Sequence, residues 1–192
     1  MYSRYFEPFP TLSTKRLRLR KMCMSDVPAL YALCKRPESA RYVEWTAHQS
    51  IGETRNYVRW VTAGYQKQYS TTWVIEKMPE KKLIGTCSFL NIDQNFKTAE
   101  VGYCLLPEEW GNGYASEAVW ALLWYGFREV GFVRIQARVM TKNSRSASLL
   151  ERLGFAKEGC LKNGVYCKNT ANDIFVYGMS DGMYYNLHGN IR

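Results

Sequence analysis

The feature that most constrains the fold is a junction of an apolar stretch, a short glycine-containing loop and a long apolar helix. Residues 101–106 have the pattern of a buried strand, and a helix is expected over about residues 114–130. The loop between them contains Gly111 and Gly113. Glycines let the backbone approach a ligand closely, and the free N–H groups of a helix N-terminus face an anion. The junction therefore predicts a phosphate-binding loop, although a plain strand-to-helix turn would also explain the glycines.

Two kinds of phosphate ligand suit this junction, because a strand, a helix and a strand in succession also form the unit that binds dinucleotides. The dinucleotide fingerprint has a third glycine or alanine where this chain has Ser116. The next strand, expected over residues 133–140, ends without an acidic residue that could bind a ribose. The junction is also not the first such unit of the chain. These departures disfavour a dinucleotide site.

Periodic patterns predict further elements along the chain. Arginine and leucine alternate over residues 15–20, which predicts a half-buried strand with a solvated arginine face; the alternative is a stripe that contacts nucleic acid. One helix is expected from Ser25 to a stop at Pro37, and a second from the capping box of Ser50 and Glu53. The other expected strands span residues 71–77, 82–92, 98–106, 155–161 and 173–179.

The last expected helix spans about residues 144–153. Asn143 suits its N-cap, and Gly154 suits its C-cap. Together with the preceding elements it gives the order of an α/β domain with a partly antiparallel sheet.

Charge and composition narrow the possible functions. The net charge of +9 would suit a nucleic acid, an anionic membrane or a small molecule with several phosphates. Two histidines give little support to a zinc cluster or a histidine-based triad, so we expect no metal and proton chemistry by carboxylates, hydroxyls or water. The longest apolar stretch, residues 118–127, is too short to span a bilayer, and the N-terminus does not resemble a secretory signal. We expect a cytoplasmic protein without a membrane partner.

Four groups of residues together resemble the GNAT acetyltransferase superfamily. They are Glu100-Val101-Gly102-Tyr103, Pro107-Glu108-Glu109-Trp110-Gly111-Asn112-Gly113-Tyr114-Ala115, Asn143-Ser144-Arg145-Ser146, and Leu153-Gly154-Phe155 with Glu158-Gly159. Their order and spacing resemble in particular the RimJ/RimL branch, the ribosomal-protein N-terminal acetyltransferases. The resemblance runs from about Thr14 to Met179. We therefore expect residues 1–192 to form a single N-acetyltransferase domain with its core over about residues 14–179.

The resemblance implies an α/β fold with a mixed sheet of about seven strands and four helices. Strands 98–106 and 133–140 would splay apart around acetyl-CoA, whose pyrophosphate would bind backbone amides of residues 110–115. Asn143 would contact the pantetheine arm or the helix entry, and Ser146 would lie near the sulfur of acetyl-CoA. The residues expected to bind the coenzyme are Leu105, Leu106, Trp110, Gly111, Asn112, Gly113, Tyr114, Ala115, Ser116, Asn143 and Ser146.

The chain departs from the superfamily pattern at two positions. Glu108 stands where the commonest phosphate loop has Gln or Arg, and Val165 stands where some relatives have a carboxylate. A catalytic glutamate is therefore not expected at position 165. Glu100 is the best carboxylate to orient or deprotonate the amine, directly or through water, although it could instead be a salt-bridged strand residue. Ser146 is expected to assist departure of the thiolate by donating a hydrogen bond, although its hydroxyl could instead only cap or line the start of the helix; Tyr166 is the next candidate.

The expected acceptor is a primary amine, most simply a protein N-terminus such as that of a ribosomal protein. An α-amine has a pKa of about 8 and a lysine amine a pKa of about 10.4. At neutral pH, forming the reactive neutral amine therefore costs roughly 3.3 kcal/mol more for lysine. A site with few bases therefore favours the α-amine. The alternatives are a small-molecule amine, either a polyamine or an aminoglycoside, and a basic nucleic-acid-binding module that is not an enzyme. The expected oligomeric state is a monomer or a homodimer.

Overall fold

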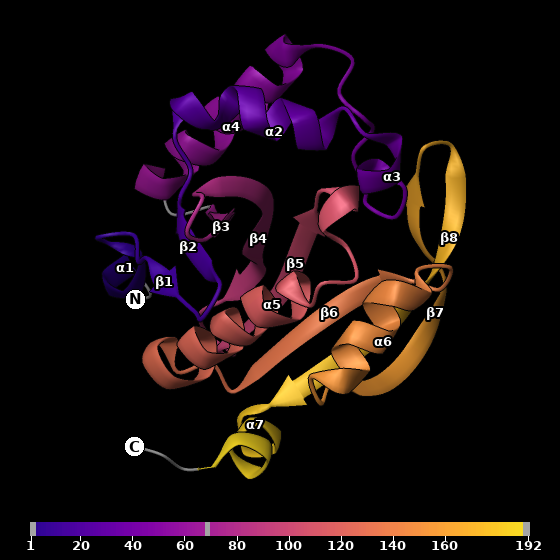
Figure 1. Ribbon diagram of the computed structural model, residues 1–192. Coiled ribbons are helices and arrows are strands. Elements are labelled where there is room, and N and C mark those ends of the chain that lie inside the picture. Colours follow the sequence, from indigo (N-terminus) through magenta and orange to yellow (C-terminus); the bar gives the residue numbers. More distant parts are fainter. Residues whose placement is uncertain (1–2, 68–69, 190–192) are drawn as a thin grey trace.

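All strands of the computed structural model, which describes residues 3–67 and 70–189, belong to one mixed sheet (Figure 1). Their order across the sheet is β1-β2-β3-β4-β5-β6-β8-β7, and β5 and β6 are the parallel neighbours. The expected mixed α/β fold is confirmed, with eight strands instead of about seven. The strands are β1 (Leu12–Ser13), β2 (Leu17–Lys21), β3 (Thr71–Lys77), β4 (Lys82–Asp93), β5 (Thr98–Leu105), β6 (Arg134–Met140), β7 (Ala156–Cys167) and β8 (Thr170–Ser180).

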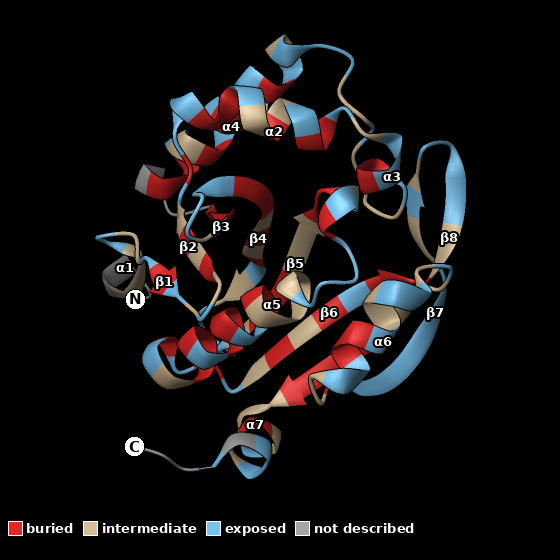
Figure 2. Cartoon of the chain, in the orientation of Figure 1, coloured by how far each residue is buried: buried red, intermediate tan, exposed pale blue. Residues whose placement is uncertain are grey.

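Helices cover both faces of the sheet, and each face has its own apolar cluster. On β3, Val74 packs with helices α2 and α4, while Trp73 and Ile75 pack with α5 and α6, as the alternation of side chains along a strand requires. Both clusters are red in Figure 2. The helices are α1 (Ser3–Phe6), α2 (Val27–Cys34), α3 (Pro37–Ala40), α4 (Ile51–Lys67), α5 (Tyr114–Trp124), α6 (Ser144–Arg152) and α7 (Asp181–His188).

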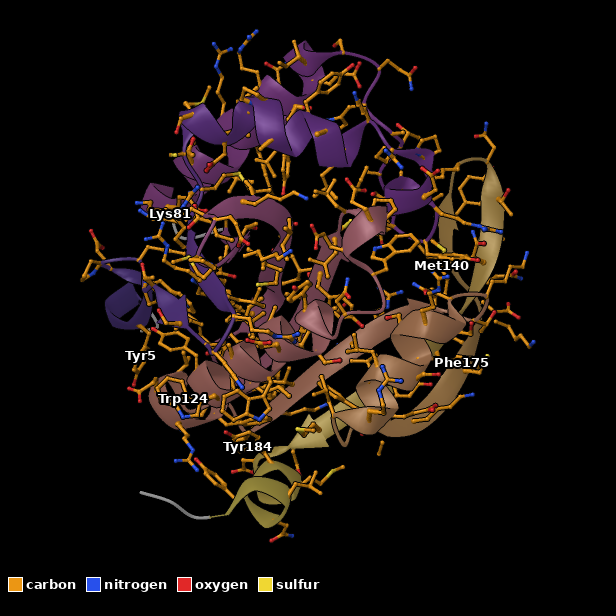
Figure 3. All side chains as sticks on the ribbon, in the orientation of Figure 1. Tyr5, Lys81, Trp124, Met140, Phe175 and Tyr184 are labelled. Carbon is orange, nitrogen blue, oxygen red and sulfur yellow. The ribbon has the colours of Figure 1, made fainter. Side chains whose placement is uncertain are left out.

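The sheet opens between β5 and β6. Residues 98–100 pair with residues 134–136, and the two strands then diverge (Figure 1). Strand β6 stays paired with β8 over its whole length, to Met140, which Figure 3 labels on the side of the molecule that carries α3 and the β7–β8 hairpin. The expected splay of these two strands is therefore confirmed.

The arginines of β2 form ion pairs. Arg18 and Arg20 both bind the buried carboxylate of Glu76 on β3, at 2.6 and 2.7 Å, and Arg20 also binds Asp26 at 2.6 Å. Arg20 is the central cation of this network, since it contacts both carboxylates. The expected solvated face is therefore wrong in detail, because neutralising buried carboxylates is more favourable than leaving them unpaired.

Helix α5 ends earlier than expected. It gives way after Trp124 to a π-helical turn, η3 (Tyr125–Val130), and Gly131 ends that turn with a φ of +79°. Helix α7, which had not been expected, packs on this turn: the rings of Phe127 and Tyr184 stack 4.9 Å apart (Tyr184 is labelled in Figure 3).

The last two strands are longer than expected and form a hairpin. The turn residues Lys168 and Asn169 have φ values of +51° and +58°, the left-handed pair typical of a two-residue hairpin turn. The side chain of Lys168 donates a hydrogen bond to the carbonyl of Ala40, so the hairpin tip contacts α3. Helix α3 itself begins at Pro37, which had been expected only to stop the preceding helix.

Candidate active site

The glycine-containing loop has the backbone geometry that its sequence predicts. Gly111 and Gly113 have φ values of +81° and +79°, a region that L-residues with side chains rarely occupy. Gly113 is the N-cap of α5, and no side chain caps the helix there. An N-terminus of this kind leaves N–H groups free to bind an anion.

Arg16, the residue just before strand β2, holds this loop in place. Its guanidinium donates a hydrogen bond to the carbonyl of Asn112 at 3.0 Å and lies 4.6 Å from the ring centroid of Tyr114. It also binds the carboxylate of Glu117, in the first turn of α5, at 2.6 Å. Burial raises the pKa of Glu117, but hydrogen bonds from Thr14 and Arg16 outweigh it and hold that pKa below its usual range. The loop is therefore held in place before any ligand binds.

Trp110 connects the loop to the end of β5 and to α6. Its indole N–H donates a hydrogen bond to the carbonyl of Leu105 at 3.0 Å, and the guanidinium of Arg145 lies 5.0 Å from its ring centroid. The side chains of Leu105 and Leu106 are buried in the two apolar clusters, and the N–H of Leu106 donates to the carbonyl of Ile84. The carbonyl of Leu106 also accepts a hydrogen bond, from the N–H of Glu109, so both backbone groups of Leu106 and the carbonyl of Leu105 are engaged within the protein.

Ser146 lies in the first turn of α6. Its backbone N–H donates a hydrogen bond to Oδ1 of Asn143 at 3.2 Å, so Asn143 is the N-cap of the helix, as its position predicts. The hydroxyl of Ser146 lies 2.7 Å from the hydroxyl of Tyr103 on β5. Tyr103 was not among the expected site residues.

Glu100 is the last residue of β5 that pairs with β6. Its register partner there is Gln136, and its side chain is 8% exposed. Burial raises the pKa of Glu100, and the hydrogen bond that it accepts from Asn91 at 3.2 Å opposes this rise. A buried carboxylate with a raised pKa is a stronger base than an exposed one. Glu100 thus stands where the sheet begins to open.

Comparison with known proteins shows the family. The model of the acetyltransferase (GNAT) domain matches residues 16–156. The chain belongs to the GNAT acetyltransferase family. This GNAT chain is 38% identical over 171 residues to the uncharacterized N-acetyltransferase YoaA of Bacillus subtilis, covering 89% of the chain and 97% of YoaA. It is 30% identical over 169 residues to the ribosomal-protein-serine acetyltransferase of Escherichia coli, covering 85% and 92%.

Solved structures confirm the GNAT fold and the resemblance to the RimJ/RimL branch. A GNAT-family acetyltransferase from Bacillus anthracis superposes with a TM-score of 0.82 at 25% identity, covering 90% of this chain and 99% of that one. RimL, a ribosomal alpha-N-protein acetyltransferase, superposes with a TM-score of 0.80 at 26% identity, covering 89% and 94%. A complex of RimL with coenzyme A superposes equally well, covering 89% and 98%.

The other predicted site residues, and the two positions that depart from the superfamily pattern, lie on β7, just before the glycine loop and in the first turn of α5. Tyr166 is on β7 near the hairpin tip, and 72% of it is exposed. Val165, where no catalytic glutamate was expected, precedes it on the same strand. Glu108 is exposed, whereas the neighbouring Glu109 is buried and binds Lys82 at 2.7 Å. Ala115 and Ser116 are partly buried in the first turn of α5.

Two absences concern the described part of the GNAT chain. Within residues 3–67 and 70–189, no group of three or more His, Cys, Asp or Glu side chains could hold a metal ion. No helix in those two ranges is both long enough and apolar enough to cross a membrane.

Proposed function

We propose that this chain transfers the acetyl group of acetyl-CoA to the α-amine of a protein N-terminus, such as that of a ribosomal protein. The observation that carries the proposal is the opening between β5 and β6 beside the preformed glycine loop. The chain would act as a single domain, and a ribosomal acceptor would place it in the cytoplasm. The ribosomal-protein acetyltransferases among its relatives support this acceptor.

Acetyl-CoA would bind along the opening. The N–H groups of residues 111–115, at the N-terminus of α5, suit its pyrophosphate, whereas the N–H of Trp110 already donates to the carbonyl of Pro107. The stack of Arg145 on Trp110 adds a positive charge beside this loop. The unpaired part of β5 would offer backbone groups to the pantetheine arm and to the thioester carbonyl, because β6 no longer occupies them.

The transfer needs a neutral amine, and Glu100 is the proposed base. The amine nitrogen forms a bond to the thioester carbonyl carbon, and the carbon–sulfur bond then breaks with its electron pair on sulfur. The proton of the amine goes to Glu100, directly or through water. Ser146 would stabilise the leaving thiolate by donating a hydrogen bond. Asn143 would act chiefly as the helix cap that holds Ser146 in place.

The arginines of β2 weaken the alternative of a nucleic-acid-binding module. Arg18 and Arg20 are bound to carboxylates, so little of their charge is available for phosphates. A gel shift with mixed nucleic acids at moderate salt should therefore show no binding, while coenzyme A is released from acetyl-CoA in a parallel assay with an acceptor.

The decisive experiment is an acceptor panel read by release of coenzyme A. One arm contains a peptide with a free serine or alanine N-terminus, and the matched control is the same peptide with its α-amine blocked and one internal lysine. Polyamines and aminoglycosides form the other arms. We expect turnover of the free α-amine and little turnover of the blocked peptide. Faster turnover of the blocked peptide, of a polyamine or of an aminoglycoside would contradict the proposed acceptor.

A further inference from the structure

One side-chain hydrogen bond connects the two sides of the sheet opening. The hydroxyls of Tyr103 on β5 and Ser146 on α6 lie 2.7 Å apart, the usual distance for a good O–H···O bond. Tyr103 is three residues beyond Glu100, where β5 no longer pairs with β6. The bond therefore crosses the region in which the strands diverge.

We infer that Tyr103 is a positioning residue that donates its hydrogen bond to Ser146 and so directs the single hydroxyl proton of Ser146 toward the sulfur of the coenzyme. The inference rests on the proposed function and adds to it the residue that orients Ser146. A serine hydroxyl has one proton and two lone pairs, so it can donate to only one partner at a time. If Tyr103 is the donor, the proton of Ser146 remains available for the thiolate.

The phenol of Tyr103 has the proton that this direction requires, and a phenol is a stronger acid, hence a better donor, than an aliphatic hydroxyl. Burial raises the pKa of Tyr103 to about 12, so the phenol is protonated at neutral pH and can donate. Tyr103 also packs its ring against the apolar cluster under α5 and α6, which limits its movement. A hydroxyl that already accepts one hydrogen bond is polarised and becomes a better donor.

Among the described residues, the hydroxyl of Ser146 has no hydrogen-bond partner other than Tyr103. Asn143 fixes the backbone of Ser146 by accepting its N–H, but this leaves the torsion of the hydroxyl free. Tyr103 supplies the missing restraint. In the transfer step the carbon–sulfur bond breaks and its electron pair stays on sulfur; the proton of Ser146 is shared with that sulfur in a hydrogen bond and is not transferred.

The test compares two tyrosines that both contact α6. Tyr103→Phe removes the hydroxyl that contacts Ser146, whereas Tyr177→Phe removes a buried hydroxyl that donates to Glu151 of the same helix at 2.9 Å. We expect Tyr103→Phe to lower kcat about three- to tenfold with the affinity for acetyl-CoA within about twofold of wild type. Tyr177→Phe should leave kcat unchanged. Equal effects of both variants would overturn the inference, since a general loosening of α6 would then explain them.

A double-mutant cycle tests whether Tyr103 acts through Ser146. The double variant Tyr103→Phe with Ser146→Ala should have the kcat of Ser146→Ala alone. Losses that multiply would show that the two hydroxyls act independently, and the positioning role would be wrong.

A second readout needs neither an acceptor nor turnover. The thiol pKa of bound coenzyme A, followed by thiolate absorbance, should be about 0.5 to 1 unit higher in Tyr103→Phe than in wild type or Tyr177→Phe, matching the three- to tenfold rate effect. Bound coenzyme A with the same thiol pKa in all three proteins would overturn the inference alone. Failure of wild type to bind coenzyme A would instead overturn the proposed function.

Discussion

At the scale of single residues, Glu100 shows how position changes the chemistry of a side chain. Burial raises its pKa, while hydrogen bonds from Asn91 and Gln136 and the charge of Arg138 act in the opposite direction. The net shift is upward, so the carboxylate is a better proton acceptor than an exposed glutamate. Its burial has a cost in folding that depends on pH.

Replacing Glu100 by Gln tests separately its role as a proton acceptor and the cost of its burial to folding. We expect Glu100→Gln to lower kcat at least about tenfold, because the amine loses its proton acceptor, and to remove the rise of kcat with pH that titration of Glu100 produces in wild type. A pH–rate profile of both proteins checks this. A full wild-type profile in Glu100→Gln would exclude Glu100 as the base.

The same variant, Glu100→Gln, should lose activity but not stability at neutral pH. A carboxyl whose pKa is higher in the folded than in the unfolded state contributes most to the free energy of unfolding at a pH below its unfolded pKa. This contribution is lost as pH rises through the folded pKa. Glu100→Gln should therefore be at least as stable as wild type at neutral pH, with an advantage that disappears below the ordinary glutamate pKa of 4.5. Urea unfolding at neutral and acidic pH measures it.

Ser146 gives the third prediction at this scale. If it stabilises the thiolate, Ser146→Ala should lower kcat ten- to a hundredfold, on the order of 1.4 to 2.7 kcal/mol, with acetyl-CoA affinity nearly unchanged. Steady-state kinetics and coenzyme binding check both parts. A change in affinity alone would make Ser146 a binding residue. If kcat stays within about threefold of wild type, the catalytic role is wrong and Tyr166 is the next residue to test.

Sequence reasoning found some of these residues and missed one for a physical reason. Asn143 and Ser146 lie in one helical turn, so their spacing alone predicts the cap that the structure contains. Tyr103 and Ser146 are 43 positions apart, and their contact depends on how β5 and α6 pack. A periodic pattern carries no information on such a pair, although Tyr103 belongs to one of the motifs that resemble the GNAT superfamily.

At the scale of elements, the loop before α5 depends on a backbone that only glycine adopts easily. Gly113→Val should weaken acetyl-CoA binding at least about tenfold, since a side chain at a φ of +79° strains the loop and separates its N–H groups from the pyrophosphate. Calorimetric titration with acetyl-CoA measures the loss.

The chain offers a matched control for this substitution. Gly131, after the π-helical turn, has the same φ of +79° and open space around the added carbon. Gly131→Val carries the same backbone strain at a distance from the loop, so it should lose stability but keep its affinity for acetyl-CoA. Equal losses of affinity in both variants would show that strain, and not the loop, controls coenzyme binding.

Elements with a buried face were the most predictable. Strand β3 is a short apolar run that is buried along nearly its whole length. Helix α4 begins at the predicted Ser50–Glu53 cap, in which the N–H of Glu53 donates to the Ser50 hydroxyl. The far half of the β7–β8 hairpin is largely exposed, so it has no apolar periodicity to read. The π-helical turn after α5 packs tightly on β6, since a side chain at Gly126 would lie 2.7 Å from Ile135, and a local sequence pattern does not predict such a tertiary contact.

At the scale of the whole molecule, ligand binding should stabilise the fold. Acetyl-CoA at about a hundred times its dissociation constant should add roughly 2.7 kcal/mol, about 5 to 10 °C in melting temperature for a chain of this size. Bound coenzyme would also contact both sides of the opening. Differential scanning calorimetry with acetyl-CoA, and with NADH as the control, measures this. A shift with NADH and none with acetyl-CoA would contradict coenzyme binding.

The opening in the sheet has one more consequence. Successive side chains of β5 lie on opposite faces of the sheet, and in a continuous sheet the paired backbones separate the two faces. Tyr103 packs on the side of α5 and α6, whereas Cys104, and by the same alternation Glu100, point to the side of α2 and α4. Beyond Glu100, β5 and β6 are no longer paired. The proposed base and the hydroxyl pair therefore lie on opposite faces of the sheet at the place where it is unpaired, so the amine and the coenzyme of the proposed reaction would approach that place from different faces.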